Sequence, residues 1–198
     1  MVIQNHLPMH MIINDIKASK TIWTIGHSTH GAEEFIKMLK VHDIKLLADI
    51  RSYPGSKRYP HFNKEILPGL LKGAGIDYIH LPQLGGRRKT SKDSINSGWR
   101  NDAFRGYADY MQTEEFKKGI KELERIASKQ STAYMCSEAV WWKCHRSLVS
   151  DYLKNEGWTV IHILSITKSE EHPFTSVARI INGKLNYGEQ GRQKKLEL

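Results

Sequence analysis

Short runs of hydrophobic residues alternate along the chain with longer stretches in which hydrophobic residues recur every three or four positions. Short apolar runs bounded by glycine or polar residues are typical of buried strands, and the longer periodic stretches are typical of amphipathic helices. The predicted strands cover residues 21–26, 44–50, 76–81, 132–135 and 159–164, with a weaker one at 177–181. The predicted helices cover residues 32–42, 63–74, 106–111, 114–128 and 144–156.

The order of these elements indicates the fold class. Strands and helices alternate over most of the chain, and such alternation is typical of an α/β fold with a mostly parallel sheet and helices on both faces. We therefore expect a single three-layer α/β domain over residues 21–182, with an amino-terminal extension at 1–20 and a basic carboxy-terminal tail at 183–198. Residues 85–104 show almost no apolar periodicity and predict a long loop.

Three helix starts carry side chains that suit capping. Thr113 and Asn63 precede predicted helices and are expected to accept hydrogen bonds from the first turn. Ser28 or Thr29 is expected to cap the helix at 32–42. Ser28, next to His27, has a second interpretation as part of an anion site.

The charge balance narrows the class of partner. The chain has 30 Lys and Arg against 21 Asp and Glu, a net charge of +9 at pH 7. This excess favours a polyanionic partner such as an anionic small molecule or nucleic acid, although a merely solvated basic surface is the alternative. No apolar run approaches the roughly 20 residues that span a bilayer, and the first residues make a poor signal peptide. We therefore expect a cytoplasmic protein without membrane association, whose two cysteines are free thiols.

Polar and reactive side chains follow each predicted strand. The carboxyl ends of parallel strands meet at one edge of a sheet, where α/β proteins bind their ligands, so we expect these side chains to share one site. The predicted catalytic residues are His27, Asp49, Cys136 and Glu138. The predicted substrate- or anion-binding residues are Ser28, Arg51, Arg87, Arg105, Cys144, His145 and Arg146.

Each of these candidates has a second, structural interpretation. Cys136, near a helix amino terminus and arginines, suits a nucleophilic thiolate, but it equally suits a buried apolar thiol, as does Cys144. Glu138 suits a general acid or base, or an ion pair with Arg51 or Arg146. Arginines suit anion binding but are more often solvated charges.

Arg105 lies among aromatic residues that suit stacking on a nucleobase. At helical spacing, the same aromatic residues suit packing in the core instead.

Several familiar kinds of site are excluded or disfavoured. Cys136, Cys144 and His145 with His27 are zinc-ligand types, but their spacing matches no standard zinc pattern, so we predict no metal site. The chain contains neither a phosphate-binding loop ending in Lys-Ser or Lys-Thr nor a Gly-x-Gly-x-x-Gly sequence, and we predict no cofactor.

Cysteine-loop enzymes such as phosphatases and sulfurtransferases need an arginine a short fixed step after the cysteine. Trp142 and Ser150 occupy those positions here, so neither cysteine begins such a loop. The two thiols are therefore not explained by this common arrangement.

Taken together, the motifs resemble the bacterial and archaeal family called Domain of Unknown Function 488. The resemblance lies in TIGHS at 24–28, DIRSYPG at 49–55, YIHLP at 78–82, LGG at 84–86, GWRN at 98–101, FRGYADYM at 104–111, C-x-E at 136–138, CHR at 144–146 and HIL at 162–164. Thr29 stands where the family often has asparagine, and residues 1–20 lie outside the pattern. The resemblance implies one α/β domain centred on the cysteine segments and implies no particular reaction.

Two functions fit these observations. The first is an enzyme acting on a phosphorylated, nucleotide or nucleic-acid substrate through Cys136, Glu138, Asp49 and Arg51, as a hydrolase or transferase that uses either carboxylate-driven glycosidic cleavage or thiol-based transfer. The alternative is a non-catalytic nucleic-acid-binding protein that uses the basic loop at residues 85–105. We favour the enzyme, because reactive residue types at strand ends are typical of an active site.

Overall fold

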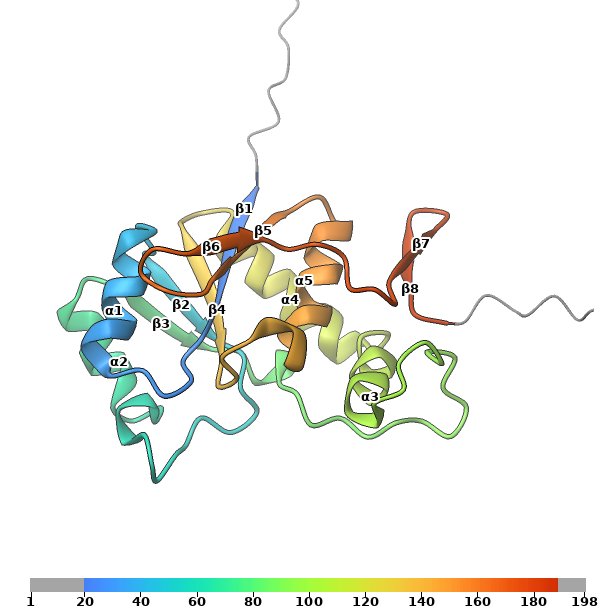
Figure 1. The fold of residues 1–198 in the computed structure, drawn as a ribbon, viewed down its shortest axis with the longest axis horizontal. Helices are drawn as coiled ribbons and strands as arrows, with labels where there is room; N and C mark the ends of the chain where they lie inside the picture. The colour runs from blue at the N-terminus through green and yellow to red at the C-terminus, as the bar shows by residue number, and fades with distance from the viewer. Residues whose placement is uncertain (1–19, 189–198) are drawn as a thin grey trace, which may run out of the picture.

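The computed structural model describes residues 20–188, in which a six-stranded sheet lies between two layers of helices (Figure 1). The strands are β1 Thr21–Gly26, β2 Leu46–Asp49, β3 Asp77–His80, β4 Thr132–Cys136, β5 Thr159–Ile163 and β6 Ser169–Glu171. Their order across the sheet is β3-β2-β4-β1-β5-β6, and all pairs are parallel except the edge pair of β5 with β6. The predicted mostly parallel α/β architecture is confirmed.

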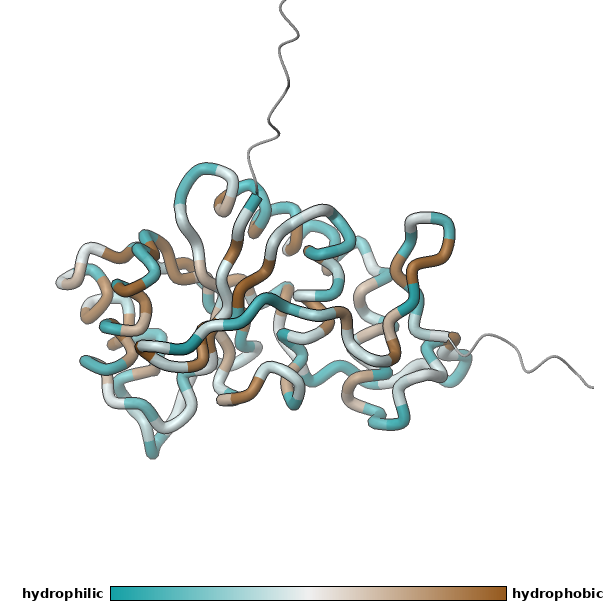
Figure 2. The backbone as a smooth tube through the Cα atoms, turned by 45° about the horizontal axis from the view of Figure 1, so that its top comes forward, coloured by the Kyte–Doolittle hydropathy of each residue, from teal (hydrophilic) through white to brown (hydrophobic). Residues whose placement is uncertain are grey.

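The helices divide between the two faces of this sheet. They are α1 Ala32–Val41, α2 Leu67–Gly73, α3 Asp102–Tyr110, α4 Glu114–Ala127 and α5 Arg146–Asn155, with short 3-10 turns η1 Pro60–Phe62, η2 Pro82–Leu84 and η3 Trp141–Lys143. Residues of α1 and α2 form one core cluster, and residues of α3, α4 and α5 form another. Figure 2 shows hydrophobic stretches alternating with hydrophilic ones along the backbone.

The alternation of side chains along the strands decides which groups reach which face. Trp23 and Ile25 of β1 pack with α1 and α2, whereas Ile22 packs with the helices of the other face. On β4, Met135 belongs to the α1 side and Tyr134 to the α5 side. Because side chains alternate in this way, a residue at a strand end is directed toward one particular half of the rim.

Several element boundaries differ from the prediction. The helix predicted at 63–74 begins only at Leu67, since the side chain of Asn63 accepts a hydrogen bond from Ser56 N–H rather than capping a helix. The helix predicted at 106–111 begins at Asp102, where Asn101 accepts from the N–H groups of Ala103 and Phe104. The hydrogen bonds of these two asparagine side chains therefore determine where the helices begin.

Of the other two predicted helix caps, one is confirmed and one is wrong. Thr113 caps α4 by accepting from Phe116 N–H, which confirms its predicted role. The expectation that Ser28 or Thr29 caps α1 is wrong, because the amino-cap residue is Gly31 and makes no side-chain cap. Ser28 has a φ of 47° and lies in a tight turn before the helix.

The last part of the described chain adds structure that the apolar pattern predicts only weakly. β7 Arg179–Ile181 and β8 Lys184–Asn186 form a separate two-stranded hairpin, and β6 extends the main sheet. β6 and β8 are three-residue strands with polar residues, which leave no apolar run to detect. The extension predicted at residues 1–20 lies outside the described residues apart from Lys20, and the predicted tail lies outside them from residue 189 onward.

The segment at residues 85–104, predicted as a long loop, forms several hydrogen bonds to one carboxylate. Asp109 on α3 accepts hydrogen bonds from Ser91 N–H, the Ser94 hydroxyl and the Asn96 side-chain amide, at 2.9, 2.6 and 2.8 Å. These bonds fix the course of the loop that leads to the rim of the sheet. No helix within residues 20–188 is long and apolar enough to cross a membrane.

Candidate functional site at the strand ends

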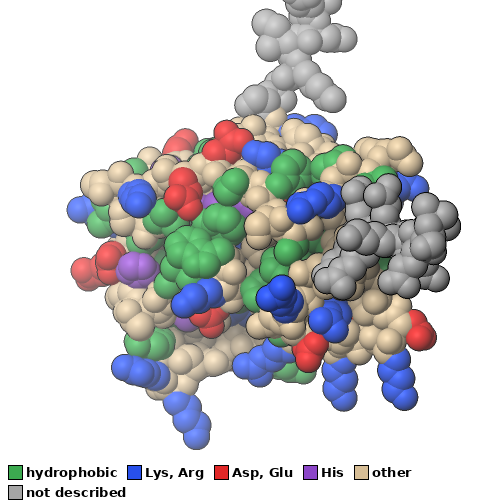
Figure 3. Space-filling view, turned by 45° about the vertical axis from the view of Figure 1, so that its right-hand side comes forward, with side chains coloured by type: hydrophobic (Ala, Val, Ile, Leu, Met, Phe, Trp, Pro, Cys, Tyr) green, Lys and Arg blue, Asp and Glu red, His purple; other side chains and the backbone are tan. Residues whose placement is uncertain are grey.

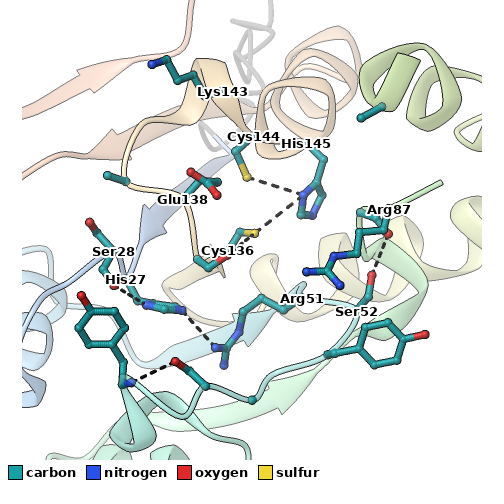
Figure 4. A pocket seen from close by; sticks show the side chains of 18 of the residues that line it. His27, Ser28, Arg51, Ser52, Arg87, Cys136, Glu138, Lys143, Cys144 and His145 are labelled. Atoms are coloured by element: carbon teal, nitrogen blue, oxygen red, sulfur yellow. Dashed lines mark hydrogen bonds between the residues drawn. The ribbon is translucent and has the colours of Figure 1, made fainter. Parts of the chain in front are cut away.

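A cleft of about 710 Å³ opens at the carboxyl ends of β1, β2 and β4. The predicted site residues that line it are His27, Ser28, Arg51, Arg87, Cys136, Glu138, Cys144 and His145 (Figure 4). Asp49, Arg105 and Arg146 do not line it. The convergence predicted from the parallel sheet therefore brings most of these residues to one place.

The backbone hydrogen bonds between β1 and β4 continue for two residues into the loops that follow these strands. The N–H groups of His27 and Ser28 donate to the carbonyl oxygens of Cys136 and Ser137, each at 2.9 Å. Gly26 lies opposite Cys136, and a side chain on Gly26 would collide with the carbonyl oxygen of Glu138. Only glycine at this position therefore allows the Glu138 loop to cross over the end of β1.

One half of the cleft, which we call the closed half, is built around the ion pair of Asp49 and Arg51. Asp49 is fully buried and Arg51 is 6% exposed, and Arg51 Nη2 lies 2.6 Å from Asp49 Oδ2. The Arg51 guanidinium also donates to the Phe62 carbonyl at 2.7 Å, and the Tyr78 hydroxyl donates to Asp49 at 2.8 Å. Burial and the Asp49 charge raise the pKa of Tyr78, so this hydroxyl stays a donor. The charge of Arg51 is therefore already balanced within the fold.

His27 completes the closed half. Its Nδ1 lies 3.0 Å from the Ser28 carbonyl oxygen and its Nε2 lies 3.2 Å from Arg51 Nη1. A carbonyl accepts and a guanidinium donates, so the ring carries its proton on Nδ1 and accepts at Nε2. Burial, followed by the charge of Arg51, lowers the pKa of His27 to about 4. His27 is thus a neutral ring with both nitrogens engaged, stacked on Phe62 at 4.1 Å between ring centroids.

The other half, which we call the open half, contains Cys136, Cys144 and His145, named here the Cys–His cluster. His145 Nδ1 lies 3.8 Å from Cys136 Sγ and 3.6 Å from Cys144 Sγ, and all three atoms lie within 4.8 Å of one another. Neither cysteine forms a disulfide. The three groups come from the end of β4 and the residues just before α5, which the fold brings together at the cleft wall (Figure 4).

The two thiols differ in their protonation. Burial by itself raises the pKa of Cys144, but the hydrogen bond from Cys136 and the charge of Arg146 outweigh it and lower this pKa to about 6. The hydrogen bond to Cys144, together with burial, raises the pKa of Cys136 to about 12. These opposite shifts favour the thiolate form at Cys144, whereas the sequence favoured Cys136 as the nucleophile.

Arg146 lies behind the cluster rather than in the cleft. It is 1% exposed, and its guanidinium donates to Thr24 Oγ1 at 3.2 Å and to the carbonyl oxygens of Glu138 and Ala139 at 2.6 and 3.2 Å. No carboxylate within residues 20–188 pairs with it. Arg146 therefore holds the loop that carries Glu138 and supplies positive charge next to Cys144. The Glu138 carboxylate is exposed and forms no ion pair with Arg51 or Arg146.

The rim of the cleft adds cations and aromatic rings. Arg87 has a φ of 62°, is exposed, and its side chain has no ion-pair or hydrogen-bond partner within the described residues. Lys143, Tyr53 and Tyr59 also line the cleft and were not among the predicted site residues. Tyr53 is 79% exposed, and its position in the turn after β2 was the only sequence signal for it.

Arg105 follows two residues that line the cleft but does not line it itself. Its Nε donates to the Trp99 carbonyl at 2.9 Å, and its Nη1 lies 3.6 Å from Asp102 on the same helix. Gly86, by contrast, lies directly against the cluster, and a Cβ there would come within 2.9 Å of His145 Nδ1. The Ser52 hydroxyl donates to the Gly86 carbonyl at 2.8 Å and fixes this approach. Gly86 and Arg87 near the start of the segment and Ala103 and Phe104 near its end line the cleft.

These features define an α/β protein with a strand-end cleft in which reactive side chains gather. The family model described as "Domain of unknown function DUF488" matches residues 31–153, more than half of the chain, and the chain belongs to this family. The matched region contains Asp49, Arg51, Glu138 and the whole Cys–His cluster, while β1 with His27 lies before it. No curated protein and no solved structure matches the chain.

Proposed function

We propose that this protein is an enzyme, a hydrolase or group transferase, that acts on a phosphorylated, nucleotide-like substrate at the Cys–His cluster. The observation that carries the proposal is the convergence of two sulfurs and one imidazole nitrogen in the wall of a large cleft. Reactive groups that converge in a cleft without forming ion pairs with one another are typical of an active site.

The state of the His145 ring supports this assignment. Its Nε2 lies 3.3 Å from the Ile50 carbonyl oxygen, which is an acceptor only, so Nε2 carries the proton. In the neutral ring the lone pair on Nδ1 then faces the two sulfurs. An imidazole held in one tautomer by a carbonyl is the usual arrangement for a group that accepts a proton or binds an electrophile.

The surroundings of the cluster favour a substrate that combines an anionic group with a planar ring. Arg87 and Lys143 line the cleft without partners within residues 20–188, so they are available to a phosphate. Tyr53 and Tyr59 line the same cleft and offer faces on which a base can stack. Figure 3 shows Lys and Arg side chains, interspersed with fewer Asp and Glu, around a hydrophobic patch on one face of the molecule, and an excess of positive charge attracts anions.

Glu138 is the group best placed for proton transfer. It lines the cleft next to the cluster, and its carboxylate is free of ion pairs within the described residues. Asp49, the other predicted carboxylate, is occupied by Arg51 and Tyr78. We therefore assign the acid–base role to Glu138 and a structural role to Asp49.

The test is a turnover assay on a panel of nucleosides, nucleoside 5′-phosphates and phosphorylated sugars. We expect Cys144→Ser and Cys136→Ser to lower the rate on the accepted substrate by about 100-fold or more, and Glu138→Gln to lower it by a similar factor. Thr29→Ala is the control, because Thr29 lines the same cleft and its side chain forms no hydrogen bond within residues 20–188. Turnover that survives both cysteine substitutions would remove the cluster from the chemistry.

The non-catalytic alternative has one observation in its favour. The side chains of Arg87, Lys89, Lys92 and Arg100 in the basic loop form no ion pair or hydrogen bond within residues 20–188. If the chain only binds nucleic acid, its affinity should fall steeply with salt and should not change in the Cys144→Ser variant. Affinity that depends weakly on salt, together with turnover that depends on Cys144, favours the enzyme.

A further inference from the structure

We propose that Cys136, Cys144 and His145 bind a Zn²⁺ ion through their two sulfurs and the His145 Nδ1, with a fourth coordination position open to the cleft. The spacing of these residues along the chain matches no standard zinc pattern, and the sequence predicts no metal. The fold overrides that spacing, because η3 folds the chain back and returns Cys144 and His145 to the end of β4.

The distances within the cluster fit tetrahedral coordination. Zinc binds sulfur at about 2.3 Å and imidazole nitrogen at about 2.0 Å, so neighbouring ligand atoms of a tetrahedron lie roughly 3.5 to 3.8 Å apart. His145 Nδ1 lies 3.6 Å from Cys144 Sγ and 3.8 Å from Cys136 Sγ, and the separation of the two sulfurs is within 4.8 Å. An ion therefore enters the cluster with only small movements of the side chains.

The second shell is also in place. A histidine that binds a metal through one nitrogen usually donates its other N–H to a carbonyl or carboxylate. His145 Nε2 lies 3.3 Å from the Ile50 carbonyl oxygen, which leaves Nδ1 as the ligand atom. Gly86 packs against this same nitrogen, and the absence of a side chain there keeps the space beside Nδ1 free.

The ligand count indicates the kind of zinc site. Structural zinc sites have four protein ligands, whereas catalytic sites have three and leave one position for water or substrate. His27, the only further ligand considered from the sequence, has both ring nitrogens engaged by Ser28 and Arg51. The cluster lines the cleft, so the fourth position faces the space where substrate binds.

This inference deepens the proposed function, and only its catalytic part rests on that function. A water molecule in the fourth position would be acidified by the ion, and Glu138 lines the same cleft to accept its proton. The hydroxide then forms a bond to the electrophilic atom of the substrate, and the leaving group departs with the proton returned by Glu138. The reaction is a hydrolysis that needs no further reactant.

Metal binding is tested without any assay of activity. The full chain is treated with a chelator under reducing conditions, dialysed, and titrated with Zn²⁺ and, in parallel, with Co²⁺. We expect one Zn²⁺ per chain, and in the Co²⁺ protein the visible absorption of tetrahedral cobalt with thiolate charge-transfer bands. Cys136→Ser, Cys144→Ser and His145→Gln should each weaken binding by more than about 100-fold.

The control is His42→Gln, which replaces a histidine on the far side of the fold from the cluster and should leave the stoichiometry and spectrum unchanged. Cobalt bound without thiolate bands, or zinc affinity that survives both cysteine substitutions, would overturn the proposal. Two further results would overturn it. One is a reduced chain that shows no saturable zinc binding, and the other is a Cys136–Cys144 disulfide as the only stable form of the pair.

The failure of this inference is distinguishable from the failure of the proposed function. A chain that binds no metal but turns over substrate in a Cys144-dependent reaction contradicts the zinc site and leaves the enzyme standing. A chain that binds one zinc through the cluster but turns over no member of the substrate panel supports the zinc site and contradicts the enzyme.

Discussion

Each half of the strand-end cleft contains a histidine and other polar side chains at or near strand ends, yet the two sets of groups differ in how they are paired. In the closed half, Asp49, Arg51 and His27 satisfy one another and leave no charge or ring nitrogen unused. In the open half, Cys136, Cys144 and His145 converge without a carboxylate and face the cleft. The closed half therefore holds the rim together, and the open half is available for chemistry.

The difference follows from the side of the sheet on which each group lies. The residues of the closed half are covered by Phe62 and the α1–α2 layer, where burial demands that charges be paired. The residues of the open half lie at the end of β4 and just before α5, where they line the cleft. Polar residues at neighbouring strand ends thus differ in function according to what covers them.

The largest effect is expected from breaking the closed half. Asp49→Asn leaves the Arg51 guanidinium buried without its counter-charge and should lower the free energy of unfolding by about 3 to 5 kcal/mol, measured by denaturant titration. Glu122→Gln is the control, because it removes the exposed partner of Arg125 and should cost less than about 1 kcal/mol. If the Asp49→Asn variant fails to fold, Tyr78→Phe removes one hydrogen bond to the same carboxylate and should cost about 1 kcal/mol. Equal, small losses for Asp49→Asn and Glu122→Gln would contradict the structural role of the closed half.

The closed half should also make stability depend on pH. The pKa of His27 is about 4 in the fold against 6.5 in the unfolded chain, so between these values the folded state binds fewer protons. The free energy of unfolding should therefore not depend on His27 above pH 6.5. As the pH drops from 6.5 toward 4 it should decrease, with a slope from His27 that approaches about 1.4 kcal/mol per pH unit. His27→Gln should remove that slope in denaturant titrations at a series of pH values. An unchanged slope in this variant would show that His27 titrates normally in the fold.

The sequence predicts the sheet better than it predicts the site. The apolar runs at β1, β2, β4 and β5 place the strands correctly, because buried parallel strands are continuous in hydrophobicity. The start of α3 at Asp102 and the short strands β6 and β8 depend on local hydrogen bonds between polar residues, which leave no periodic signal. The parallel order also predicts which residues reach the rim, since that follows from topology alone.

What the sequence does not supply is the division of those residues into two halves. Asp49 and Glu138 are both carboxylates at or just past the end of a strand, and only the fold shows that one is paired and the other free. Arg146 looks like an anion clamp from its neighbours, yet it is buried against carbonyl groups. Some of the contacts that orient these groups join residues about a hundred positions apart, such as His145 with Ile50 and Arg146 with Thr24.

The open half should be dispensable for folding. In the reduced, metal-free chain, Cys144→Ser and Cys136→Ser should each change the free energy of unfolding by about 1 kcal/mol, because each exchanges one small buried group for another. The same variants should lose the turnover predicted above. Denaturant titration in the presence of chelator and reductant measures this effect. A loss as large as that of Asp49→Asn would mean that the cluster, too, serves mainly to hold the fold.

The smallest effect on stability and a specific effect on binding are expected at the rim. Arg87→Gln should change the free energy of unfolding by less than about 0.5 kcal/mol, yet weaken the binding of a nucleoside 5′-phosphate about tenfold, as measured by calorimetry. Arg100→Gln removes a cation of the same loop that does not line the cleft, and should leave binding unchanged at the same salt concentration. Arg87→Gly separates charge from backbone strain, because glycine suits the φ of 62° at this position. We expect the glycine variant to lose as much affinity as the glutamine variant while folding at least as stably as the original chain. An equal loss of affinity for Arg100→Gln would mean that the loop attracts anions only by its overall charge.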